Sequence, residues 1–343
     1  MIQVSRPVAT IATAFARMSQ SGGIALHSTG PSPLHLYLTA SHVAPPRRSR
    51  YPIDMRLRLA FAALFALCAT QASAQTFAPA SPNDGMQAAR DQILTETRGS
   101  VFPGPRPGET RVVWVWRPHN APATPLPVFY IFDGLDGLRT ALLRLKPAFD
   151  SGALAPILIV APDPNPRNES RGAEYLRGFP GGSDDFQRHE DWFVHQVVPW
   201  AQRTQRASVD PSKSFVGGFS NGADLALVLA NDHPDLFGGA LVHSPVGAQA
   251  GWVGQGAGGQ RWVVTGGTRE TSGSVHRPAD VPRQIIAALE HANAPLRRCI
   301  GAWAHVGPAW RDLTPGSLVW LMGLGDPNVY ATAPEQAACR NAP

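Results

Sequence analysis

Gly218-Phe219-Ser220-Asn221-Gly222 is the stretch that decides the fold, because it has the Gly-x-Ser-x-Gly pattern of a nucleophile elbow. The apolar run Ser214-Phe215-Val216-Gly217 before it predicts a buried strand, and the apolar stretch Ala223–Ala230 after it predicts a helix. A turn this sharp has no room for side chains two positions before and after its serine, which explains the glycines. It would expose the hydroxyl of Ser220 beside a helix N-terminus, where free N–H groups favour developing negative charge.

Short apolar runs alternate with longer amphipathic stretches from Gln75 onward. The central runs are apolar throughout, which is typical of strands covered on both faces of a parallel sheet. The alternation predicts an α/β fold in residues 75–343, with a mostly parallel, doubly wound sheet and helices on both faces of a single domain. The expected strands are Val112–Trp116, Val128–Phe132, Ile157–Ala161, Phe215–Gly218, Ala240–His243, Trp262–Thr265 and Cys299–Trp303. The expected helices are Arg139–Lys146, Trp192–Gln202, Ala223–Asn231 and Val281–Ala292.

Residues 1–74 differ in composition and are expected to lie outside this domain. Residues 1–54 contain one acidic residue and no regular hydrophobic period, which indicates a non-native or disordered leader. Met55 then begins a basic segment, an apolar run too short to span a bilayer, and an Ala72-Ser73-Ala74 site. These are the parts of a secretory signal peptide over residues 55–74, so we expect cleavage after Ala74 and a periplasmic or secreted protein. The alternative is a disordered basic leader or a transit peptide.

The basic character of the chain belongs to this N-terminal segment. The whole sequence has a formal charge of +5, but seven arginines and one aspartate lie in residues 1–74. The other 269 residues have 23 basic and 24 acidic side chains. This balance gives no reason to expect a nucleic acid or an acidic membrane surface as a partner. The oligomeric state stays open.

Of the three cysteines, Cys68 lies in the predicted signal peptide, which leaves Cys299 and Cys339 as an even pair. In an oxidising compartment they would form a disulfide that ties the C-terminal tail to a core strand, and two free thiols are the equal alternative. No metal site is expected. His189 and His195 are six residues apart, whereas a spacing of four places two imidazoles on one helix face. No organic cofactor is expected either.

A serine hydroxyl is a weak nucleophile near neutral pH and needs a general base within hydrogen-bond reach. After a nucleophile elbow, the acid and then the histidine follow in the chain, each after a strand. His305 follows the strand Cys299–Trp303 in a short loop and is the expected base. The expected acid is Glu270, directly after the strand Trp262–Thr265, where it would orient the imidazole. Asp280, ten residues further on, is its rival.

Two main-chain N–H groups are expected to form an oxyanion hole. One belongs to Asn221, the residue after the nucleophile. The other belongs to Leu135, in the turn Asp133-Gly134-Leu135 that ends the strand Val128–Phe132.

Seven segments between Val112 and Leu321 match one set of motifs. They are Phe132–Leu135, Arg171–Tyr175, Asp191–Trp200, Gly217–Gly222, Pro234–Phe237, Gly267–Glu270, and His305 with Trp310 five residues on. Together they resemble the esterase branch of the α/β-hydrolases, which holds enterochelin esterases, feruloyl esterases, S-formylglutathione hydrolases and secreted mycolyltransferases. The resemblance implies the α/β-hydrolase fold and a serine esterase that cleaves a carboxylic ester through an acyl-enzyme. It also favours Glu270 over Asp280.

The resemblance makes Arg171 and Trp310 candidate substrate-binding residues. The alternatives are a structural ion pair that involves Arg171 and Glu174, and a place for Trp310 in the core. The ester stays open among siderophore lactones, feruloyl esters of polysaccharide and simple acyl esters. Two alternative functions stay open. The first is an enzyme that transfers the acyl group to an alcohol, and the second is a non-catalytic binding protein on the same scaffold.

Overall fold

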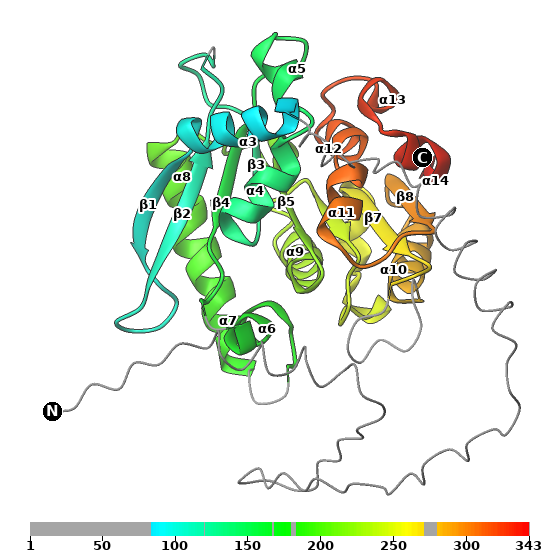
Figure 1. The fold of residues 1–343 in the computed structure, drawn as a ribbon. Coiled ribbons are helices and arrows are strands. Elements are labelled where there is room, and N and C mark those ends of the chain that lie inside the picture. The colour runs from blue at the N-terminus through cyan, green and yellow to red at the C-terminus, as the bar shows by residue number, and fades with distance from the viewer. Residues whose placement is uncertain (1–83, 120, 167, 180–182, 271–279, 343) are drawn as a thin grey trace, which may run out of the picture. The chain divides into compact units, whose positions relative to one another are not determined.

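The computed structural model describes residues 84–342, apart from residues 120, 167, 180–182 and 271–279. The predicted leader and signal peptide lie outside the described residues, as does the start of the predicted domain. The described part is one nine-stranded sheet with helices on both faces, which confirms the predicted fold class (Figure 1). None of the described helices is long and apolar enough to cross a membrane.

The strand order of the sheet is β1-β2-β4-β3-β5-β6-β7-β8-β9. The six strands from β4 to β8 in this order are parallel, whereas β1 pairs antiparallel with β2, β2 with β4, and β9 with β8. The carboxyl ends of the parallel strands therefore meet at one edge of the sheet. The strands are β1 (Arg98–Pro103), β2 (Thr110–Trp116), β3 (Val128–Ile131), β4 (Leu158–Pro162), β5 (Ser214–Phe219), β6 (Gly239–His243), β7 (Arg261–Gly267), β8 (Leu296–Gly301) and β9 (Cys339–Ala342).

Helices cover the two faces of the sheet and bury two apolar clusters (Figure 1). One cluster contains residues of α4 and α12, and the other contains residues of α8, α9 and α10. Every residue of β3 and β5 is buried between them, as their uninterrupted apolar sequences predict. The helices are α3 (Asp84–Glu96), α4 (Gly134–Leu142), α5 (Lys146–Asp150), α6 (Asn168–Tyr175), α7 (Ser183–Trp192), the π-helix η1 (Phe193–Val197), α8 (Val198–Thr204), α9 (Asn221–Asp232), α10 (Asp280–His291), α11 (Gly307–Leu313), α12 (Pro315–Met322), α13 (Pro327–Tyr330) and α14 (Ala333–Ala338).

Two of the predicted helices differ from the structure. The segment predicted as Arg139–Lys146 begins earlier, because Asp133 and Gly134 adopt left-handed backbone angles that start α4 directly after β3. The segment predicted as Trp192–Gln202 contains the π-helix η1, which ends just before Pro199. Proline lacks the N–H that an uninterrupted α-helix would need at this point, so the helical register changes there.

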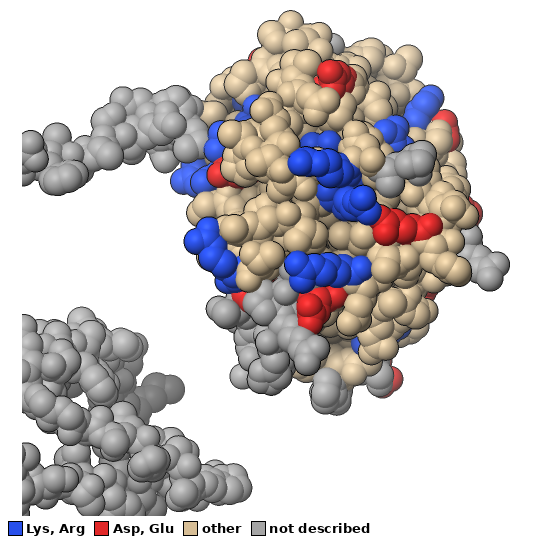
Figure 2. Space-filling model, turned by 90° about the vertical axis from the view of Figure 1, so that its right-hand side faces the viewer, with Lys and Arg blue, Asp and Glu red and all other residues tan. Residues whose placement is uncertain are grey.

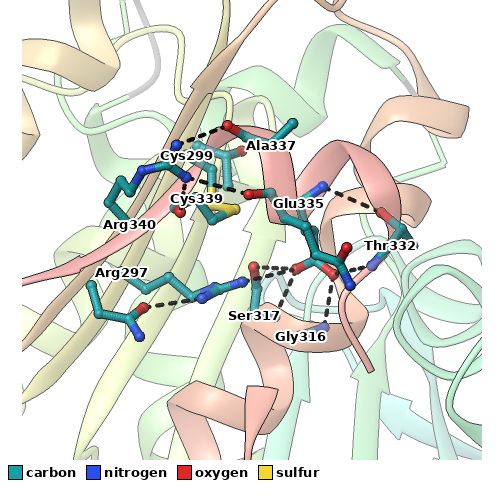
Figure 3. The surroundings of a disulfide bond; sticks show 12 residues. Arg297, Cys299, Gly316, Ser317, Thr332, Glu335, Ala337, Cys339 and Arg340 are labelled. Atoms are coloured by element: carbon teal, nitrogen blue, oxygen red, sulfur yellow. Dashed lines mark hydrogen bonds and ion pairs between the residues drawn. A yellow bond between two sulfur atoms is a disulfide. The ribbon is translucent and has the colours of Figure 1, made fainter. Parts of the chain in front are cut away.

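The last predicted strand has different bounds, and the C-terminal strand β9 was not predicted. The strand predicted as Cys299–Trp303 is β8, which begins at Leu296 and ends at Gly301. The prediction left out the two arginines near its start, because they interrupt the apolar run. Arg297 is buried and donates to Asn341 in β9 (3.0 Å). Cys299 and Cys339 form a disulfide between β8 and β9, so of the two alternatives the structure shows the bonded one (Figure 3).

Glu335 holds α12 close to this disulfide (Figure 3). Its buried carboxylate accepts hydrogen bonds from the backbone of Gly316 (2.9 Å), the backbone of Ser317 (2.8 Å) and the Ser317 hydroxyl (2.8 Å). Burial raises the pKa of Glu335, and these hydrogen bonds oppose that rise. The carboxylate thereby satisfies backbone donors at the N-terminus of α12 that the helix itself leaves free.

Candidate active site

Ser220 occupies a sharp turn between β5 and α9. Its backbone has a φ of 55° and a ψ of −127°, a conformation that L-residues rarely adopt. A Cβ at position 218 would lie 2.3 Å from the carbonyl group of Gly222, so Gly218 cannot be replaced without moving the turn. A Cβ at position 222 would lie 3.3 Å from the Asp133 carboxylate, a tighter contact than most side chains tolerate. The two glycines thus allow the turn that the sequence predicts.

His305 lies in the loop between β8 and α11, and its Nδ1 is 3.1 Å from Oε2 of Glu270. Glu270 follows the end of β7, so neighbouring strands of the sheet deliver the two side chains to the same edge. Both are largely buried. Asp280, the rival acid, begins α10 and lies 3.7 Å from Arg283. The structure therefore pairs His305 with Glu270.

The other oxygen of Glu270 is also occupied. Oε1 accepts a hydrogen bond from the hydroxyl of Ser244 (2.6 Å) and one from the backbone N–H of Gly267 (2.7 Å). Donors to the charged form stabilise a carboxylate and fix its orientation. Ser244 was not identified from the sequence; its position directly after β6, at the carboxyl edge of the sheet, is the signal that would have found it.

Trp310 in α11 packs against the histidine–carboxylate pair. Its ring lies edge-on to His305, with centroids 5.0 Å apart, and stacks on Phe219 at 5.3 Å. Its indole nitrogen donates to the hydroxyl of Ser244 (3.0 Å). Trp310 thus packs against the apolar core and also contacts His305 directly and Glu270 through Ser244.

Arg171 is held by an ion pair beside the nucleophile. Its Nε and Nη2 donate to the two carboxylate oxygens of Asp133 (2.6 and 2.7 Å), and its guanidinium lies over the ring of Tyr175. The expected ion pair exists, but its acid is Asp133. Glu174 is buried and accepts from Arg111 (2.8 Å) instead.

The two predicted oxyanion donors have different surroundings. Asn221 is the first residue of α9, so the helix itself leaves its backbone N–H free. The backbone N–H of Leu135 lies near the carboxylate of Asp163 and lowers the pKa of that group. Burial raises the pKa of Asp163 overall, against the effects of the Leu135 N–H and of a hydrogen bond from Trp114. An oxyanion at this position would therefore compete with Asp163 for the Leu135 N–H.

A cavity of about 780 Å³ opens beside the turn. Ser220 and His305 both line it, as do Arg171, Phe219 and Trp310. The candidate nucleophile, base and substrate-binding residues thus share one cavity, whereas Glu270 lies behind His305 in its wall.

Asp224 anchors the loop that follows β6 and carries Ser244. Its buried carboxylate accepts from the backbone N–H groups of Val246, Gly247 and Ala248, at 3.2, 3.1 and 2.8 Å. Burial raises the pKa of Asp224 to about 7 in spite of these donors. Asp224 is thus a structural group of the elbow helix, outside the pair formed by Glu270 and His305.

The strand order, the elbow and the histidine–carboxylate pair define an α/β-hydrolase. Residues 104–282 match the family described as "Putative esterase". Because this match spans just over half of the sequence, the chain belongs to that esterase family and is a carboxylic ester hydrolase. The family expected from the motifs is thereby confirmed.

Solved structures are similar to the chain at low sequence identity. A ferulic acid esterase has a TM-score of 0.53 and 16% identity, over 68% of this chain and 97% of that chain. An S-formylglutathione hydrolase from Agrobacterium tumefaciens has a TM-score of 0.50 and 13% identity, over 67% of this chain and 96% of that chain. An enterochelin esterase from Shigella flexneri has a TM-score of 0.50 and 18% identity, over 66% of this chain and 57% of that chain. These similarities show the fold. No curated protein matches the sequence.

Proposed function

We propose that this esterase is an exported serine hydrolase in which Ser220, His305 and Glu270 form the catalytic triad. The observation that carries the proposal is the hydrogen bond between His305 Nδ1 and Glu270 (3.1 Å), in the wall of the cavity that Ser220 lines. A carboxylate on Nδ1 keeps the proton on that nitrogen, so that Nε2 is free to act as the base.

The proposed reaction proceeds in two halves. The Ser220 hydroxyl attacks the ester carbonyl and gives its proton to His305, which then protonates the departing alcohol. This leaves an acyl group on Ser220. Water attacks the acyl-enzyme, again with His305 as the base, and the carboxylic acid departs as the serine regains its proton.

The oxyanion of each tetrahedral intermediate would be bound by the N–H groups of Asn221 and Leu135. Both lie at the start of helices that begin at the carboxyl edge of the sheet, α9 and α4. In this proposal the Leu135 N–H donates to the oxyanion, with the Asp163 carboxylate nearby. The helix N-termini add a favourable partial positive charge.

Export is supported by the signal-peptide pattern in residues 55–74 and by the disulfide between Cys299 and Cys339. Disulfides persist in secreted and periplasmic proteins and are rare in reducing compartments. Mass spectrometry of protein recovered from outside the cytoplasm should find Gln75 as the first residue. A mature N-terminus upstream of Met55 would refute this part of the proposal.

Hydrolysis of 4-nitrophenyl butyrate by purified wild type and by Ser220→Ala tests the triad. Loss of a serine nucleophile typically lowers kcat by about 10⁶-fold, so the variant should be inactive above background. Ser212→Ala is the matched control, because Ser212 lies outside the cavity and is bound to Asp210. Adding an acceptor alcohol then shows whether the acyl group goes to water or to the alcohol. Substantial activity in Ser220→Ala would overturn the proposal.

A further inference from the structure

Apart from His305, the basic residues that line the cavity beside Ser220 are all arginines, among the residues that the structure describes. Arg139 comes from α4, Arg311 from α11 and Arg90 from α3, and α4 packs against both other helices. The fourth, Arg171, is already occupied by Asp133. Three helices from distant parts of the sequence thus each direct an arginine to one cavity.

The acidic residues of the cavity leave some of this charge uncompensated. They are Asp91, Asp133 and Asp136, so four arginines face three aspartates. Asp136 lies 3.4 Å from Arg139, but its side chain is 89% exposed, so water and salt screen this pair. Asp91 has a partner of its own.

Arg311 has only a distant acidic partner in the described part of the chain. Within the described residues it donates no hydrogen bond, and its ion-pair contact is a distance of 3.9 Å between its Nε and Asp312. Asp312 accepts a closer hydrogen bond from Arg144 (3.0 Å). Several arginines elsewhere have close acidic partners, such as Glu290 for Arg298, and basic and acidic side chains lie side by side on the face in Figure 2.

Arg311 lines the same cavity as Ser220. It follows Trp310, which packs against His305, and both residues line the cavity. Leu94 and Leu143 also line this cavity, on the helix of Arg90 and just after the helix of Arg139. The cavity therefore combines apolar surface with guanidinium groups in its wall.

We propose that Arg139 and Arg311 form a subsite for a carboxylate group of the substrate, so that the preferred ester is anionic. The proposal rests on the proposed function, since it assigns the substrate class of the same site. A guanidinium presents two parallel N–H donors that match a carboxylate, and it is less strongly hydrated than an ammonium group. Arginine at these two positions suits this task better than lysine would.

Wild-type kinetics test the proposal with two matched pairs of esters. One pair is the mono-4-nitrophenyl ester of adipic acid against 4-nitrophenyl heptanoate, with the charge on the acyl part. The other is 4-acetoxybenzoate against 4-acetoxybenzamide, with the charge on the alcohol part. In at least one pair kcat/KM should favour the anion by about tenfold at low salt, the scale of one charge-assisted hydrogen bond. About 0.5 M NaCl should reduce this preference, because salt screens partly exposed charges.

Variants then locate the effect. Arg311→Gln and Arg139→Gln should each lower the anion-to-neutral ratio of kcat/KM by about fivefold to tenfold. Arg298→Gln is the control, because it removes the same net charge from β8, outside the cavity. A ratio that drops equally in the control would overturn the proposal.

The proposal would also be overturned by equal rates, or a neutral preference, in both pairs of the wild type. That result needs no variant, so a folding defect cannot obscure it. Failure here is distinct from failure of the triad: an enzyme that hydrolyses neutral esters through Ser220 without favouring anions keeps the proposed function and loses only the subsite.

Discussion

Trp310 lies edge-on against His305, with ring centroids 5.0 Å apart and ring planes at 90°. The indole nitrogen of Trp310 donates to Ser244, which in turn donates to Glu270. Trp310 thus supports the imidazole by packing and its carboxylate partner by a hydrogen-bond relay. Because it acts through these neighbours, we regard Trp310 as a positioning residue.

Replacing Trp310 by phenylalanine keeps an aromatic ring against His305 but removes the donor to Ser244. We expect kcat/KM for 4-nitrophenyl butyrate to fall about fivefold, the cost of one hydrogen bond, with most of the change in kcat. Trp200→Phe is the control, since Trp200 packs on Phe102 and does not line the cavity. Unchanged kcat in Trp310→Phe would show that the relay through Ser244 does not matter.

Glu270→Gln should keep the fold and lose most activity. An amide cannot stabilise the imidazolium and favours the wrong tautomer of His305, which lowers kcat by about 10³–10⁴-fold in triads of this kind. Asp280→Asn, the change in the rival acid, should stay within about twofold of wild type because Asp280 lies at the start of α10. Steady-state kinetics with circular dichroism of both variants check this. The reverse ranking would make Asp280 the acid.

The disulfide should contribute to stability because it closes a long loop. Cys299 and Cys339 are 40 residues apart, and a cross-link of this span stabilises the folded state by about 4 kcal/mol in the chain-entropy account. The double variant Cys299→Ala/Cys339→Ala should lose about that much free energy of unfolding in urea. Reductant should destabilise the wild type and leave the variant unchanged. A loss below about 1 kcal/mol would contradict the expectation.

His189 should make the protein sensitive to acid. It is fully buried against Phe132, Tyr175 and Trp192, and burial lowers its pKa from 6.5 to about 3. The unfolded chain therefore binds a proton that the folded state does not bind between these pH values. This contribution to stability is fully present above pH 6.5 and is lost as the pH falls towards 3.

His189→Leu removes this titration without leaving a hydrogen-bond partner unpaired, because both ring nitrogens of His189 lack hydrogen-bond partners among the described residues and Nδ1 lies 3.7 Å from Glu174. Relative to wild type, its free energy of unfolding should rise as the pH falls from 7 to 5, by at most about 1.4 kcal/mol per pH unit. His291→Leu is the control, because it removes a histidine that is exposed at the end of α10. Parallel pH profiles for His189→Leu and wild type would refute the expectation.

The central strands and the elbow were predictable from sequence because they depend on local patterns. An uninterrupted apolar run identifies β5, and the two glycines around Ser220 leave few alternatives to a tight turn. The order of motifs along the chain likewise selected Glu270 and His305. In the structure, Oε2 of Glu270 lies 3.1 Å from Nδ1 of His305.

Other features were not predictable because they depend on contacts between distant segments. Ser244 matters only because Trp310 and Glu270 reach it from other parts of the chain. The edge strand β9 has the sequence Cys-Arg-Asn-Ala, which lacks an apolar period, and it is held by pairing with β8 and by the disulfide. The acidic partner of Arg171 was also unforeseen, because Asp133 is 38 residues away.

Labelling with a fluorophosphonate, followed by peptide mass spectrometry, tests the catalytic assignment most directly. The reagent reacts only with a serine whose hydroxyl is activated by a base. We expect a single adduct on Ser220 in the wild type and strongly slowed labelling in His305→Ala. An adduct on another serine, or labelling of Ser220 at an unchanged rate without His305, would contradict the account.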